Sequence, residues 1–115
     1  MKTFNNLDEA VNSIIESSQK HAKATQTGDY KTANLNYAVI NSAVTYLKEK
    51  GEIEKLKELL AYNDLSVKLW VASYLIKQND QKAAAVLEEI SAQSIRHHSF
   101  HARMVLQDWR KGKLF

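Results

Sequence analysis

Apolar residues recur at helical spacing along most of the chain, and the densest run covers residues 63–77 (NDLSVKLWVASYLIK). One face of that run carries Leu65, Leu69, Ala72, Leu75 and Ile76, and most of the remaining circumference carries Val67, Trp70, Val71 and Tyr74. A helix that is apolar on nearly every side has to lie between other helices. The run therefore predicts a central helix whose only open side is a narrow polar strip of Ser66, Ser73 and Lys77.

The same periodicity predicts further helices on both sides of this one. Two long helices are expected over residues 6–28 and 29–50, with Asn6 and Glu9 in a capping-box arrangement and Gly28 and Gly51 as stops. A short helix over 52–61, one that begins at Asp80, and a last one from Ser94 or Ser99 to Lys111 complete the set. The pattern predicts an all-α chain of five to six helices.

The two long N-terminal helices have stripes that predict their packing faces. In the first, the stripe consists of Leu7, Ala10, Val11, Ile14, Ile15 and Ala22. In the second, the main stripe consists of Tyr30, Ala33, Tyr37, Ile40, Val44 and Leu47. A polar strip of Asn34, Asn41, Thr45 and Lys48 follows the second helix, either as a hydrogen-bonding surface or as an ordinary solvated face.

Composition supports one small helical domain over residues 1–115. The chain has no proline, three glycines and no cysteine, which favours helices and excludes disulfides and thiolate metal sites. The N-terminal 27 residues have no long apolar core for a signal peptide or membrane span, so we expect a soluble, cytoplasmic protein. A net charge of +3 is well below that of a dedicated DNA-binding domain.

Two pairs of helices in the C-terminal half repeat one pattern. A shift of 31 residues superimposes Ile53, Leu56 and Leu59 on Ala84, Leu87 and Ile90, and a shift of 33 superimposes Val67, Leu69 and Ala72 on Phe100, Ala102 and Val105. Residues 29–112 resemble HEAT and armadillo repeats, through the element Asp64-Leu65-Ser66-Val67-Lys68-Leu69 with Ala72 and Leu75. The second copy lacks the turn aspartate. The resemblance implies a HEAT-like superhelix of about three hairpins.

The C-terminal run SFHARMVLQDWRKGKLF is similar to the ends of small bacterial HEAT-like proteins of uncharacterised function. That similarity implies no enzymatic activity and no cofactor. Small helical-repeat proteins also occur as immunity proteins beside secreted toxins, including those of contact-dependent growth inhibition.

Candidate sites lie mainly in the last helix. His97, His98 and His101 form a cluster in which His97 and His101 could ligate zinc with Asp108, but Asp108 lies almost two turns beyond His101, so we expect no metal site. Arg96, Arg103 and Arg110 repeat every seven residues and either bind an acidic partner or form a solvated face. Trp70 is either an interface anchor or a core residue.

These patterns together indicate a binding protein and not an enzyme, because the chain has no phosphate-binding glycine loop, nucleophile elbow or convergent acids. We expect one surface formed by Asn34, Asn41 and Thr45, by Trp70, Ser73 and Lys77, and by Arg96, Arg103 and Arg110. The partner would be a protein, in the sharpest form a secreted toxin that this chain neutralises. The alternative is a basic helical-repeat adaptor or nucleic-acid-binding protein.

Overall fold

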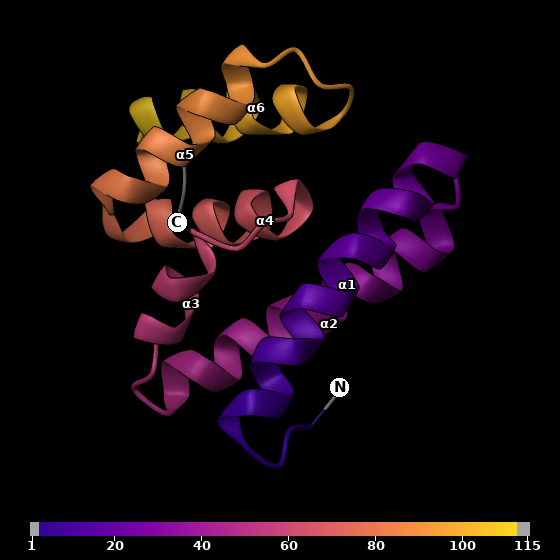
Figure 1. Cartoon of the computed structure of the whole chain (residues 1–115), viewed down its shortest axis with the longest axis vertical. Helices are drawn as coiled ribbons and strands as arrows, with labels where there is room; N and C mark the ends of the chain where they lie inside the picture. The colour runs from indigo at the N-terminus through magenta and orange to yellow at the C-terminus, as the bar shows by residue number, and fades with distance from the viewer. Residues whose placement is uncertain (1–2, 113–115) are drawn as a thin grey trace. The chain divides into compact units, whose positions relative to one another are not determined.

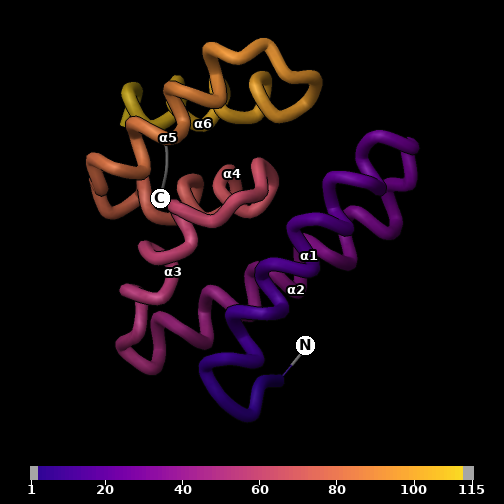
Figure 2. Tube along the Cα trace, viewed as in Figure 1, coloured from indigo at the N-terminus to yellow at the C-terminus, as the bar shows by residue number. Residues whose placement is uncertain are grey.

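A computed structural model describes residues 3–112, and every regular element in that range is helical (Figure 1). The elements are α1 (Leu7–Thr27), α2 (Tyr30–Glu49), α3 (Glu54–Leu59), α4 (Leu65–Leu75), the 3-10 turn η1 (Ile76–Gln78), α5 (Gln81–Ala92) and α6 (His98–Arg110). The predicted all-α class is confirmed. The chain divides into two compact units, residues 1–56 and 57–115, which we describe separately (Figure 2). The prediction of a single domain stays a prediction.

The first unit is built on a hairpin of α1 and α2, which pack along each other (Figure 1). The Asn6 side chain accepts the Glu9 backbone N–H at 2.8 Å and caps α1, as predicted, while the Glu9 carboxylate accepts from the Asn5 amide. Gly28, at φ 75°, ends the helix with two backbone bonds to its last turn, from Gly28 N to Thr25 O and from Asp29 N to Ala24 O. Asp29 then caps α2, so a two-residue connector both ends one helix and starts the next.

The buried face of α1 differs from the predicted stripe. Ala10, Ser13, Ile14, Ser17, Ser18 and Ala24 are buried, whereas Leu7, Val11, Ile15 and Ala22 are only partly covered. The interface therefore lies on the serine side of the helix. Small side chains allow two helix axes to approach closely, and the Ser18 hydroxyl donates to the Ile14 carbonyl at 2.6 Å, so its burial leaves no unpaired donor.

Two tyrosines of the predicted α2 stripe lie outside the core. Ala33, Ile40, Val44 and Leu47 are buried as predicted, but Tyr30 is 74% exposed and Tyr37 is 47% exposed. Both lie on the helix edge that also carries Asn34 and Asn41. An apolar ring with a polar tip fits the margin of a helix interface as well as its centre, and periodicity does not distinguish the two places.

The second unit surrounds α4, which packs on α5 and α6. Seven of the eleven residues of α4 are buried, including Val67, Leu69 and Val71, so the predicted central helix is confirmed. Its start is capped by Asp64, whose carboxylate accepts the Val67 N–H at 3.0 Å. Asp80 caps α5 in the same way, through Ala83 N–H. The short α3 is two residues shorter at each end than predicted, because i to i−3 backbone bonds make turns on both sides of it.

The residues that begin and end α6 are spaced from those of α4 by the same number of residues. The cap residues Asp64 and His97 are 33 residues apart, and so are the left-handed residues Asn79 (φ 59°) and Gly112 (φ 70°) that follow the two helices. Ser66 and Ser99, at equivalent positions, are both buried. The starts differ, because His97 makes no side-chain cap bond and has φ 65° and ψ −51° with a 2.7 Å bond from His98 N to Arg96 O. That geometry is a strained γ-turn.

Candidate binding surface

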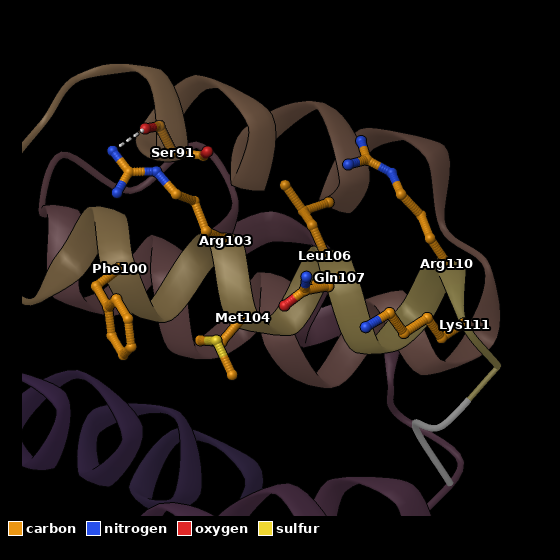
Figure 3. A pocket seen from close by; sticks show the side chains of 8 residues that line it. All are labelled: Ser91, Phe100, Arg103, Met104, Leu106, Gln107, Arg110 and Lys111. Carbon is orange, nitrogen blue, oxygen red and sulfur yellow. Dashed lines mark hydrogen bonds between the residues drawn. The ribbon is translucent and has the colours of Figure 1, made fainter.

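An open groove of about 570 Å³ runs along the exposed side of α6 and reaches α5 at Ser91 (Figure 3). It is lined by Ser91, Phe100, Arg103, Met104, Leu106, Gln107, Arg110 and Lys111. All but Ser91 and Lys111 belong to α6, and no carboxylate is among them. The groove therefore combines apolar side chains with three positive charges.

Phe100 and Met104 supply the apolar part of the groove. Phe100 is 64% exposed and Met104 is 41% exposed, and both project from α6 on the side away from α5 (Figure 3). They are one helical turn apart, so their side chains form one continuous patch. The repeat pattern indicates burial instead, because the 33-residue shift aligns Phe100 with Val67 and Met104 with Val71, which are 0% and 1% exposed.

Two of the predicted arginines border the groove and are held by α5. The Arg103 guanidinium donates to the Ser91 carbonyl at 3.1 Å, which orients it across the last turn of α5 (Figure 3). Arg110 forms a 2.7 Å ion pair with Glu88, and both side chains are more than half exposed. Arg96 is exposed in the connection between α5 and α6. The arginine stripe thus partly serves to join α5 and α6, while its remaining N–H donors face solvent.

The side chains of the three histidines in the predicted cluster have different surroundings and do not converge. The His98 Nε2 lies 2.9 Å from the Ser66 hydroxyl, and His101 stands edge-on to the Trp70 ring with centroids 5.4 Å apart. His97 occupies the γ-turn. Within residues 3–112, no three His, Cys, Asp or Glu side chains come together in a way that could hold a metal ion. The contacts of His98 and His101 instead join the first turns of α6 to α4.

The α4 residues of the predicted surface are mostly used in packing. Trp70 is only 9% exposed, so its indole behaves as a core residue against His101 and Tyr74. The Ser73 hydroxyl donates to the Leu69 carbonyl within the helix at 2.7 Å. Lys77 is exposed and its ammonium lies over the Tyr74 ring at 5.5 Å. Around α6, His101 and Arg103 are about 160° apart, so Trp70 and the arginines flank opposite sides of this helix.

The polar strip of α2 is exposed and richer in aromatic surface than predicted. Asn34 and Asn41 are exposed, and Thr45 is partly covered. Tyr30 and Tyr37 lie on the same strip, at one-turn spacing from the asparagines. This second patch carries no charge except at its ends.

Comparisons of the chain with protein-family models, with curated proteins and with solved structures gave no match. None of the helices in the described range combines the length and the apolar character that crossing a bilayer requires. The site therefore has to be interpreted from its own geometry.

Proposed function

We propose that this chain is a non-enzymatic protein-binding module that docks its partner on the groove of α6. The observation that carries the proposal is the pair Phe100 and Met104, exposed side by side and bordered by Arg103, Arg110 and Lys111. Aromatic residues, methionine and arginine are the side chains enriched at protein interfaces, whereas lysine and acidic residues are depleted there. A solvated face would carry mainly short polar or charged residues.

The proposal includes a HEAT-like arrangement for α3–α4 and α5–α6. Its support is the common 33-residue spacing of the caps at Asp64 and His97 and of the left-handed residues Asn79 and Gly112. Repeats of this kind use their exposed helix faces to bind other macromolecules. The sharpest version is an immunity protein that covers the active site of a secreted toxin.

A photo-crosslinker tests the docking face without knowledge of the partner. p-Benzoyl-phenylalanine replaces Phe100 in one variant and Tyr30, an aromatic residue of α2 that is even more exposed, in the control. We expect position 100 to crosslink one protein, identified by mass spectrometry, and position 30 not to crosslink it. Crosslinks to RNA or DNA at position 100 would overturn the proposal in favour of nucleic-acid binding.

Co-expression tests the immunity role. The immunity role predicts that a secreted-toxin domain is encoded beside this gene, that this domain co-purifies with the wild-type chain and that it does not kill cells containing that chain. Phe100→Glu should remove both effects, because a carboxylate would replace the ring in the centre of the patch, while Tyr30→Glu should retain them. Killing in the presence of folded wild-type chain would eliminate the immunity role.

A further inference from the structure

We infer that the groove of α6 accepts one acidic amphipathic α-helix of a partner protein, with bulky apolar residues on Phe100 and Met104 and carboxylates beside Arg103 and Arg110. This inference rests on the proposed protein-binding function and adds the chemistry of the segment that is bound. Two independent observations carry it, the burial of the equivalent face in the preceding helix pair and the charge around the groove.

The burial comparison indicates what kind of element fits the face. Val67 and Val71 occupy on α4 the positions that Phe100 and Met104 occupy on α6, and they are 0% and 1% exposed. All regular elements of residues 3–112 are helices, so in the first copy this face is covered within a helical packing arrangement. On α6 the matching face is open and carries larger apolar side chains. A helix laid along it would bury side chains at i, i+3, i+4 and i+7.

The charge around the groove selects the polar face of that helix. Arg103, Arg110 and Lys111 line it, and the neighbouring carboxylate is Glu88, which is already paired with Arg110. Arg103 is held by the Ser91 carbonyl through one nitrogen. A guanidinium has five N–H donors, so both arginines retain donors for an incoming carboxylate. A second copy of this chain would present the same basic face and be repelled by it.

The test uses the purified chain and three synthetic helical peptides of equal length. The first has leucines on one face and glutamates on the other; the second has lysines in place of the glutamates; the third has serines in place of the leucines. Binding is measured by amide chemical-shift changes, which the 13.1 kDa size allows to be mapped by residue. We expect only the first peptide to bind and its shifts to centre on residues 98–111.

Variants separate the apolar and charged contributions. Phe100→Ser with Met104→Ser should weaken the acidic peptide about tenfold or more, whereas Tyr30→Ser should leave it unchanged. Arg103→Gln should weaken it a few-fold with a smaller dependence on salt. Glu88→Gln is the sharpest test, because it releases Arg110 from its 2.7 Å ion pair with Glu88 and should tighten binding of the acidic peptide about two- to fivefold.

The outcomes distinguish this inference from the function on which it rests. Equal binding of acidic and lysine peptides, shifts centred outside α6, or self-association of the chain through this face would overturn the acidic-helix assignment. If position 100 still crosslinks a protein in that case, the protein-binding function stands and only the chemistry of the partner is wrong. If position 100 crosslinks no protein, the function itself fails.

Discussion

The hydroxyl of Ser99 joins α5 to α6, and its removal should destabilise the second unit measurably. Ser99 is 2% exposed. Its Oγ donates to the Ile90 carbonyl at 2.7 Å and accepts the Ile95 N–H at 2.7 Å. The Ile90 carbonyl keeps a second partner, the Gln93 N–H at 3.2 Å, so Ser99→Ala removes the partner of Ile95 N–H above all.

The magnitude follows from the cost of a partly buried N–H that loses its acceptor. Such a loss costs about 1–3 kcal/mol, against about 1 kcal/mol for an average hydrogen bond. With a urea dependence of about 2 kcal/mol per molar, Ser99→Ala should lower the unfolding midpoint by about 0.5–1.5 M. Tryptophan fluorescence is the suitable signal, because both tryptophans, Trp70 and Trp109, lie in α4 and α6.

Ser73→Ala is the matched control for this measurement. The Ser73 hydroxyl donates to the Leu69 carbonyl of its own helix, and alanine is the better helix former. The stability of the Ser73→Ala variant should therefore stay within about 0.5 kcal/mol of the wild type. A Ser99→Ala midpoint indistinguishable from that of Ser73→Ala would refute the bridging role of Ser99.

Three further predictions concern helix ends and a half-buried histidine. Asp64→Ala should destabilise the second unit by about 1 kcal/mol in urea unfolding, because the Val67 N–H loses the carboxylate that caps it. An unchanged midpoint would show that water replaces the Asp64 carboxylate as the acceptor. Gly28→Ala should lower the thermal midpoint by an amount equivalent to about 1–2 kcal/mol; the cause is the φ of 75° and not a clash, because an added Cβ meets no atom within 4 Å. Gly28→Asn should cost less, because asparagine tolerates the left-handed region better, and a larger loss for asparagine would contradict this strain argument. Burial lowers the pKa of His21 below its ordinary value of 6.5, so the unfolded chain binds a proton at this imidazole more readily than the folded chain does. The contribution of His21 to stability should therefore be constant above pH 6.5 and fall as the pH drops through the folded pKa. His21→Gln should flatten the slope of stability against pH between about pH 7 and 5, and equal slopes in both proteins would contradict the argument.

Most helix positions could be predicted from the sequence because their determinants are local, whereas the start of α6 at His97 was not predicted. Asn6, Asp29, Asp64 and Asp80 all accept a backbone N–H three residues later, and Gly28 ends its helix in the left-handed region. At Asp29 the bonds from the Thr32 hydroxyl and N–H also lower the pKa of the carboxyl group. None of these bonds depends on how one helix packs against another.

Packing faces were predicted less well because they depend on contacts that are distant in sequence. Hydrophobicity correctly placed Ala10 and Ile14 in the buried face of α1, but it missed the buried Ser13, Ser17 and Ser18. Small side chains allow the helices to approach, and their low hydrophobicity hides that role in the sequence. Tyr30 was wrongly predicted to lie in the core, because its aromatic ring fits an apolar stripe even though its hydroxyl can face water.

The candidate site was predicted in part, and its missing half has a physical cause. The seven-residue spacing located Arg103 and Arg110, but Phe100 was noted only as the repeat equivalent of Val67 and not as a surface residue. An alignment of repeats gives the face on which a residue lies and not whether another element covers that face. Only the structure shows that Val67 is covered and that Phe100 is open.

The side chains on the open face of α6 support the proposal that a partner covers this face. An end that remains in water is favoured by polar outer residues, as in the capping repeats of solenoid proteins. At the positions of Val67, Trp70 and Val71, α6 has Phe100, Arg103 and Met104. The apolar character is retained at two of the three, in larger side chains, and the third becomes an arginine fixed on the Ser91 carbonyl. Exposing such apolar side chains to water raises the free energy of the folded chain and covering them lowers it, so these three residues support the proposal of a bound partner.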